Sequence, residues 1–474
     1  MEDVATKIAT FVQKEFDTSA VPALQEFIAI PNTSKQYDAE WQTNGLLEKA
    51  AEHLTTWVKS QNLENATVEI LKQPGLSPLI FIEIQGSEST SETVLMYGHY
   101  DKQPHMVGWR EGLGPTKPVI EGEKLYGRGG ADDGYSIFAS VLAVKACQVN
   151  GLPHSRVLIM IEGDEESGST HLPIYFDLLS QRIGSPSLIV CLDSGCINYD
   201  QLWLTSSLRG NLKVNLTVRI IEEGVHSGDA SGIVPDTFRI LRQILARVEN
   251  VETGEVHKDF TVEVPEHRLN EAKAVAAIVG EELRKSFPWT GEAEATSQDP
   301  LTLYLNRTWL PQLTVVGQDG LPPTNIAGNV LRPETTVKIS LRLPPTLDAE
   351  KAFLRMKEIC ESNPPYRSKV TLEKVSAGYG WNAPKYSDHL QSTLENASKL
   401  FFKKELMNLG EGGSIPFMNM LAEKYPSTQF CVLGVLGPAS NAHGPNEFIH
   451  LGYTKKLISS VAYTLASCFN KLKK

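Results

Sequence analysis

The sequence predicts an α/β fold in which a mostly parallel sheet carries a second, inserted α+β domain. The chain has 474 residues, more than one hydrophobic core usually holds, so two domains are expected. Over residues 4–208, helical periodicity alternates with short apolar runs, a pattern typical of a largely parallel sheet. Residues 213–220 then alternate apolar with polar side chains, which indicates a strand with one exposed face.

The elements of the first domain follow from these periods. Runs such as residues 94–97 and 157–161 are entirely apolar, as expected for strands that are buried on both faces. Helices are predicted at residues 46–60 and 135–149, and strands at residues 67–71, 79–84, 94–97, 157–161 and 188–192.

The second domain is predicted to interrupt the first. Residues 376–384 contain two glycines and a proline, so they are predicted to be a linker that returns to the first domain. We therefore assign residues 1–208 and 377–474 to the first domain and residues 209–376 to the inserted one. The remaining predicted elements are strands at 213–220, 313–316, 337–343, 369–375 and 430–435, and helices at 236–251, 348–360, 390–402 and 454–472.

Composition excludes several classes of partner. The formal net charge of −11 argues against nucleic acid or an anionic membrane as the main partner, since both attract a basic surface. The N-terminal segment is an amphipathic helix pattern without the basic start and apolar core of a signal peptide, and no apolar run is long enough to span a bilayer. The six cysteines form no CxxC pair. We expect a cytoplasmic protein with reduced thiols and no membrane partner.

Acidic residues and histidines gather in five clusters, and three of these directly follow a predicted strand. Parallel strands present their carboxyl ends at one edge of a sheet, where α/β proteins bind ligands. Imidazole and carboxylate ligands without thiolate suit zinc, manganese or cobalt. A hydrolytic site with two metal ions is therefore predicted. The clusters are His99 with Asp101, Asp132 with Asp133, Glu165 with Glu166, Asp193, and His443.

The clusters allow an assignment of roles. His99 and Asp193 are predicted to hold one ion and Glu166 and His443 the other, with Asp132 bridging both. Asp101 follows His99 by two residues, so it is well placed to accept the second N–H of the imidazole. Glu165 neighbours a ligand without being needed as one, and this favours it as the general base.

Each cluster has a simpler explanation when it is taken alone. Asp132 and Asp133 could cap a helix, and Glu165 and Glu166 could begin one. The occurrence of all five clusters in this order favours the metal site. The chain contains no GxxxxGK[ST], HExxH or GxSxG sequence, and residues 127–134 lack the GxGxxG spacing. P-loop phosphoryl transfer, single-zinc proteolysis, serine hydrolysis and dinucleotide binding are disfavoured.

The order of motifs resembles the dinuclear metallopeptidases of the aminoacylase and carboxypeptidase G type, especially the cytosolic non-specific dipeptidase and carnosinase branch. The resemblance implies a zinc-peptidase-like catalytic domain, an inserted lid and dimerisation domain, and two zinc or manganese ions per chain. It implies the same five ligands, two catalytic acids at Asp101 and Glu165, and a cis peptide bond after Asp132. The matching segments are GHYD at 98–101, YGRGGADDG at 126–134, EGDEESGS at 162–169, LDSG at 192–195, SLRG at 207–210, GVHSG at 224–228, SLRL at 340–343, GEGGSIP at 410–416 and AHGPNE at 442–447.

The resemblance also implies residues that bind substrate. His226 would reach the active site of a partner subunit and stabilise the oxyanion, and Asn329 would also act across the dimer. Arg342 and Ser414 would hold the terminal carboxylate of the substrate. The expected activity is hydrolysis of dipeptides by a homodimer. Deacylation of N-acyl amino acids, or carboxypeptidase action on longer peptides, remains an alternative. Retention of every ligand and both acids disfavours an inactive binding protein.

Overall fold

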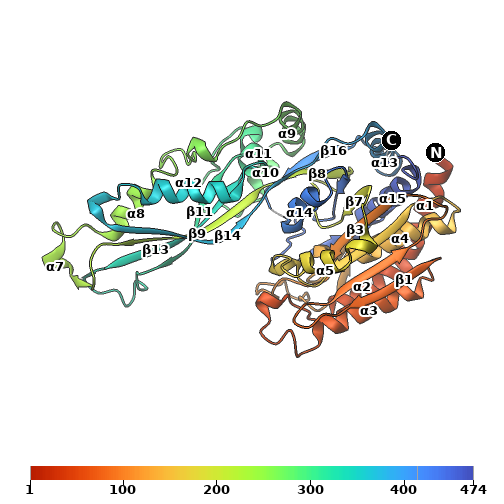
Figure 1. Cartoon of the computed structure of the whole chain (residues 1–474), viewed down its shortest axis with the longest axis horizontal. Coiled ribbons are helices and arrows are strands. Elements are labelled where there is room, and N and C mark those ends of the chain that lie inside the picture. The colour runs from red at the N-terminus through yellow and green to blue at the C-terminus, as the bar shows by residue number, and fades with distance from the viewer. Residues whose placement is uncertain (1, 414, 473–474) are drawn as a thin grey trace. The chain divides into compact units, whose positions relative to one another are not determined.

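The computed structural model describes residues 2–413 and 415–472 and divides the chain into two compact units (Figure 1). The first unit comprises Met1–Thr205, Ala383–Leu409 and Pro416–Lys474. The second comprises Ser206–Asn382 and Gly410–Ile415, so it interrupts the first in sequence. The short segment Gly410–Ile415 belongs to the second unit, whereas the sequence analysis assigns it to the first domain.

The first unit is built on a six-stranded sheet with the strand order β1-β2-β6-β3-β7-β17. Strands β6, β3, β7 and β17 are parallel to one another, while β2 is antiparallel to both β1 and β6. The predicted α/β class with a mostly parallel sheet is confirmed. The strands are β1 (Ala66–Leu71), β2 (Leu79–Ile84), β3 (Thr93–His99), β6 (Arg156–Glu162), β7 (Leu188–Cys191) and β17 (Gln429–Val432).

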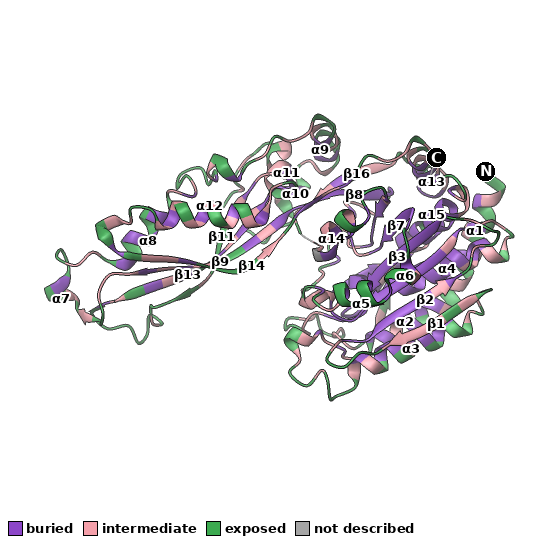
Figure 2. Cartoon of the chain, viewed as in Figure 1, coloured by how far each residue is buried: buried purple, intermediate pink, exposed green. Residues whose placement is uncertain are grey.

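Helices cover both faces of this sheet, and this explains the uniformly apolar strands. All seven residues of β3 are buried (Figure 2). On one face a Cβ added to Gly98 would overlap Ser136 at the start of α4 (Tyr135–Val149), so the glycine permits a close approach. On the opposite face the ring centroids of Tyr97 and Phe417 lie 3.6 Å apart, and Phe417 belongs to α14 (Pro416–Lys424).

The other helices of the first unit complete these layers. Helix α3 (Leu46–Ser60) packs on β1 and β2, and α15 (Leu451–Ser467) packs on α4. The bounds predicted for α3 and α4 are confirmed. Helix α15 begins earlier than the predicted residue 454, because His450 Nδ1 accepts the amide N–H of Tyr453 and caps the helix. The remaining helices are α1 (Glu2–Glu15), α2 (Val21–Ile28), α5 (Leu172–Leu178), α6 (Ser180–Ile183) and α13 (Asp388–Ala397).

A small antiparallel sheet joins two distant parts of the first unit. Its strand order is β18-β5-β4, with β4 (Val119–Glu121), β5 (Lys124–Tyr126) and β18 (Phe448–His450). Phe448 pairs with Tyr126. The segment that follows β5 therefore lies beside the segment that precedes β18.

The second unit contains a four-stranded antiparallel sheet with the order β11-β13-β9-β14. Alternate residues of β9 and β13 are fully buried and form one core with α8 and α12. The half-exposed strand predicted at residues 213–220 thus corresponds to β9, which begins three residues earlier and ends one residue earlier. The elements are β9 (Gly210–Arg219), β11 (Gln312–Asp319), β13 (Glu334–Leu343), β14 (Lys369–Gly378), α8 (Thr237–Leu245), α9 (Glu266–Val279), α11 (Pro300–Thr308) and α12 (Ala349–Glu361).

The segment predicted as a linker at residues 376–384 does carry the chain back to the first unit, which resumes at Ala383, but residues 376–378 and 381–382 of it lie in strands. Strand β14 continues to Gly378, and β15 (Trp381–Asn382) pairs with β8 (Trp203–Leu208). A Cβ on Gly380 would lie 2.7 Å from Pro345 Cα and 2.8 Å from the carbonyl oxygen of Leu208, so this glycine serves close packing and not chain flexibility.

All six cysteines are buried, and no disulfide bond joins them in the described structure. None of the described helices combines the length and the apolar character that crossing a membrane requires.

A buried histidine at the start of β6 should make the stability of the protein depend on pH. His154 is 1% exposed, and its Nδ1 lies 2.8 Å from the carbonyl oxygen of Ser155. Burial lowers the pKa of His154, although the Ser155 carbonyl and Glu64 oppose this shift. The folded state therefore resists protonation more than the unfolded chain does.

We predict that His154→Gln flattens the dependence of stability on pH. Below about pH 6.5, the ordinary histidine pKa, the unfolded wild-type chain binds a proton first, so wild-type stability should fall as the pH is lowered. Urea unfolding at about pH 7.5 and 5.5 measures the free energy of unfolding of both proteins. The wild type should lose more than the variant, and equal losses would contradict the role of His154.

Candidate metal centre and active site

The sheet of the first unit brings three of the acid and histidine clusters to one edge. His99 is the last residue of β3. Glu165 and Glu166 lie in the short turn η4 (Glu165–Ser167), which follows β6. Asp193 comes two residues after β7. Because β6, β3 and β7 are adjacent and parallel, their carboxyl ends meet at this edge.

Two loops supply the other predicted ligands. Asp132 lies in the segment between β5 and α4, and its peptide bond to Asp133 is cis, as the resemblance implies. His443 lies between β17 and β18 and has a positive φ of 65°. Pairing of β5 with β18 places these two loops next to each other.

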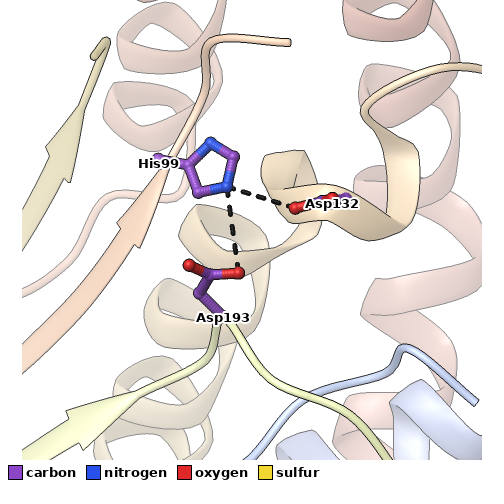
Figure 3. Close-up of side chains that lie close together, drawn as sticks. All are labelled: His99, Asp132 and Asp193. Carbon is purple, nitrogen blue, oxygen red and sulfur yellow. Dashed lines mark hydrogen bonds and ion pairs between the residues drawn. The ribbon is translucent and has the colours of Figure 1, made fainter. Parts of the chain in front are cut away.

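The side chains form two groups that each could hold a metal ion. In the first group, His99 Nε2 lies 3.3 Å from Asp132 Oδ1 and 3.9 Å from Asp193 Oδ1 (Figure 3). In the second, His443 Nε2 lies 3.0 Å from Asp132 Oδ2 and 3.4 Å from Glu166 Oε2. Asp132 belongs to both groups and contacts each histidine through a different oxygen.

The residues present fit divalent cations. Glu166 Oε1 and Asp133 Oδ1 are buried oxygens without a hydrogen-bond partner among the residues that the structure describes. A buried oxygen without a hydrogen-bond partner destabilises the folded state unless another group interacts with it. The donors of both groups are imidazole nitrogens and carboxylate oxygens, a set that suits zinc or manganese.

The electrostatics of the cluster also favour bound cations. Burial, with the charge of Asp132, raises the pKa of Glu166 to about 8. Burial raises the pKa of Asp193 to about 6, although His99 opposes this. For His443, burial lowers the pKa, but the hydrogen bond to Asp132 outweighs it and the pKa rises to about 9. Ionisation of these buried carboxyl groups is therefore costly, and a cation would stabilise their ionised forms.

Asp101 links two parts of the site. Its carboxylate oxygens each accept one amide N–H, from Glu165 and from Glu166, at 3.1 Å. His99 Nδ1 lies 3.1 Å from the main-chain carbonyl oxygen of Asp101 and 3.4 Å from its carboxylate. The carbonyl therefore fixes the imidazole as closely as the carboxylate does, a contact that the sequence analysis did not predict.

Glu165 is the unengaged carboxylate of the site. Burial, together with the charge of Asp193, raises its pKa well above the ordinary value. Within residues 2–413 and 415–472 its carboxylate has no hydrogen-bond partner. Its oxygens are therefore available to a proton from substrate or water.

Gln103 and Glu447 support the site but were not singled out from the sequence, and Asp133 was named there without a role. Gln103 Nε2 donates to Glu166 Oε2 at 2.5 Å, and Asp133 Oδ2 accepts the amide N–H of His99 at 3.1 Å. Glu447 accepts the amide N–H of Asp132 at 3.2 Å. Asp133 and Glu447 lie inside the motifs 126–134 and 442–447, but spacing alone does not indicate which member of a motif holds the others.

The predicted substrate-binding residues lie in the second unit. His226 is in β10 (Val225–His226), which pairs with β12 (Val330–Leu331), and its side chain is 67% exposed. Asn329 is next to it, because its carbonyl oxygen accepts the amide N–H of Ser227 at 3.0 Å. Arg342 lies on β13, half-buried, and burial lowers its pKa. Ser414 lies outside the described residues.

Residues 95–467 match the profile of peptidase family M20/M25/M40, and this range includes all seven residues predicted to be ligands or catalytic acids. The chain belongs to this family. The expected family and the expected class of enzyme, a peptide-bond hydrolase, are confirmed.

Known members of peptidase family M20/M25/M40 resemble the chain over most of its length. It is 25% identical over 418 residues to the cysteinylglycine-S-conjugate dipeptidase of Corynebacterium striatum, covering 84% of this chain and 86% of that protein. It is 27% identical over 392 residues to the Beta-Ala-His dipeptidase of Homo sapiens, covering 79% and 74%. The solved structure of the di-peptidase Dug1p from Saccharomyces cerevisiae has a TM-score of 0.76 at 21% identity, covering 98% and 99%, and so shares the fold.

We predict that Asp132→Ala removes both metal ions from this M20 peptidase, because both groups share that carboxylate. Elemental analysis after dialysis should give two ions per wild-type chain and close to none for the variant. Asp200→Ala is a matched control, since Asp200 is an exposed acid of the first unit that pairs with Lys404. Retention of two tightly bound ions by Asp132→Ala would rule out a shared ligand.

Proposed function

We propose that the protein is a metal-dependent dipeptidase that cleaves dipeptides with a free C-terminal carboxylate, using two zinc or manganese ions. The observation that carries the proposal is the Asp132 carboxylate, which is shared by two ligand groups beside the unengaged Glu165. The names of the relatives agree with it, since the proteins from C. striatum and H. sapiens are both dipeptidases.

In the proposed mechanism, Glu165 moves the proton. Two divalent ions at this site would polarise the scissile carbonyl and lower the pKa of a bound water. Glu165 takes a proton from the attacking water and passes it to the leaving amine nitrogen. Asp101 keeps Glu165 in position through its main-chain amide. His226 donates an N–H to the oxyanion that develops on the substrate.

Arg342 and Ser414 are proposed to hold the substrate carboxylate. A guanidinium offers two parallel N–H groups that match a carboxylate. Arg342 has no carboxylate within ion-pair distance in the part of the chain that is described, so its fork is available to a ligand. This selects for substrates with a free C-terminus.

Distances inside the second unit support a homodimer in which His226 serves the partner subunit. His226 and Asn329 lie beside β12, before the start of β13, whereas Arg342 is near the end of that strand. From Glu334 to Arg342 the strand extends roughly 26 Å at about 3.3 Å per residue. An extended dipeptide spans only about 7 Å. One second unit therefore does not provide both His226 and Arg342 to the same dipeptide, and we infer that the partner provides one of them.

An edge strand supports the same inference. Strand β11 pairs with β13 alone and leaves its other edge without a strand partner among the described residues. Val315 and Val316 on this strand are 44% and 56% exposed. Exposed, apolar edge strands are ready to pair with another chain. We propose a second copy of this chain as that partner.

A cytoplasmic location is also proposed. No disulfide bond joins the six buried cysteines in the described structure, as is usual where thiols stay reduced.

Substrate assays with Mn²⁺ or Zn²⁺ test the proposed function. Cys-Gly, Ala-Ala and β-Ala-His should be hydrolysed faster than their C-terminal amides and than N-acetyl amino acids. Glu165→Gln should retain both ions but lose at least about 10²-fold in kcat, the usual contribution of a general base. Preference for N-acetyl amino acids would identify a deacylase, and release of C-terminal residues from longer peptides would identify a carboxypeptidase. A fully active Glu165→Gln protein would contradict the role of Glu165.

Mixed dimers test whether His226 acts across the interface. His226→Ala and Glu165→Gln chains should each be inactive alone and should regain activity when mixed. In a mixed dimer one site has Glu165 from one chain and His226 from the other, while the second site has neither. Random exchange makes half the dimers mixed, so recovery should reach up to roughly a quarter of wild-type activity. Absence of recovery after verified subunit exchange would mean that His226 does not act across the interface.

A further inference from the structure

A buried carboxylate outside both ligand groups holds the main chain of the Asp132 loop. Glu447 is completely buried. It accepts N–H groups from Gly129 at 3.0 and 3.1 Å, Ala131 at 3.2 Å and Asp132 at 3.2 Å. One carboxylate thus fixes the backbone immediately before and at the shared ligand.

Arg128 extends this contact to the loop of His443. Its Nη1 donates to Glu447 Oε2 at 2.7 Å, and its Nη2 donates to the carbonyl oxygen of Gly444 at 2.7 Å. Gly444 directly follows His443. The guanidinium therefore connects the loop of one ligand with the loop of another through two charge-assisted hydrogen bonds.

The small sheet sets the register of this connection. Strands β5 and β18 pair through Tyr126 and Phe448, and the next contact along the ladder is the amide of Gly127 with the carbonyl oxygen of Glu447 at 3.0 Å. Past this point one segment leads to Asp132 and the other leads back to His443. Glu447 and Arg128 lie at the start of these two segments.

We propose that Glu447 and Arg128 are positioning residues that fix the two ligand loops relative to each other and so set the affinity for the second ion. The second ion is the one assigned to the Asp132, Glu166 and His443 group, and the inference rests on the proposed two-metal function. Residues that hydrogen-bond to metal ligands without contacting the metal typically lower metal affinity by about 10- to 100-fold when they are mutated.

The second ion should be more sensitive than the first. His99 and Asp193 are placed by β3 and β7, which lie inside the six-stranded sheet. His443 belongs to a loop, and its side chain is 56% exposed. When the contact between Glu447 and Arg128 is weakened, the sheet therefore continues to hold two ligands of the first ion. His443 instead loses the contact that fixes the adjacent Gly444 to the Asp132 loop.

Titration of metal-free protein with Mn²⁺ tests this inference without relying on turnover. The wild type should bind two ions. Glu447→Gln, which keeps the shape but removes the charge, should weaken binding of the second ion by about 10- to 100-fold and leave the first within a few-fold of wild type. Excess Mn²⁺ should restore much of the lost kcat, because the ligands themselves remain.

Glu92→Gln is the matched control. Glu92 is also a buried carboxylate that accepts a main-chain amide, from Leu472 at 2.7 Å, but it precedes β3 and so lies at the end of that strand opposite to His99. It should bind both ions like the wild type. If Glu447→Gln does not unfold cooperatively on heating, Arg128→Lys is the deciding variant, since it keeps the charge but loses the two-pronged contact.

The outcomes separate this inference from the function on which it rests. A wild-type protein that binds fewer than two ions would overturn the two-metal proposal itself. If the wild type binds two ions and Glu447→Gln (or the deciding variant Arg128→Lys) binds both with unchanged affinity, only the positioning role of Glu447 and Arg128 would be overturned. Equal weakening by Glu92→Gln would also overturn it, because the effect would then follow from any lost buried carboxylate.

Discussion

The structure of the first unit depends on the convergence of negative charge around one buried aspartate. Asp132 contacts His99 through one oxygen and His443 through the other. Burial and the negative charge of Asp132 raise the pKa of both Glu166 and Asp193, so both carboxyl groups are harder to ionise. Like charges at such distances repel, so they remain together only where the surrounding chain holds them and a counter-charge is supplied.

The sheet and its loops supply that restraint in different ways. The parallel strands deliver His99, Asp193 and the glutamate turn to one edge through their register. Buried carboxylates add main-chain contacts: Asp133 accepts the N–H of His99, Asp101 accepts those of the glutamate turn, and Glu447 accepts that of Asp132 in its loop. Carboxylates therefore perform two tasks in this unit: some face the candidate metal site, and others hold the backbone behind it.

Much of this arrangement could be predicted from the sequence because its signals are local. The apolar runs that become β3, β6 and β7 end in acids or histidine, and parallel strands bring such ends together. The same reasoning fails for contacts between distant segments. Gly129 and Glu447 are 318 residues apart, and no periodicity in either segment indicates that they meet.

Weak local signals account for the remaining differences. Helix α9 was not predicted because it buries only Arg268, Ala272, Val275 and Ala276, which do not form a broad apolar stripe. The glycines at residues 378 and 380 suggest a flexible segment, but Gly380 lies where Pro345 and Leu208 leave no room for a side chain. The sequence shows that a glycine has no side chain, but it does not show that tight packing is the reason.

The interruption of the first unit has a consequence for the order in which the chain is made. The second unit is complete, except for Gly410–Ile415, once residue 382 has left the ribosome. The first unit still lacks β17, α15 and His443 at that point. Domains generally fold as units during synthesis, so the inserted unit should mature before the one that surrounds it. The hydrolytic centre then assembles only at the end of translation, and a prematurely terminated chain would carry a folded insert without a working site.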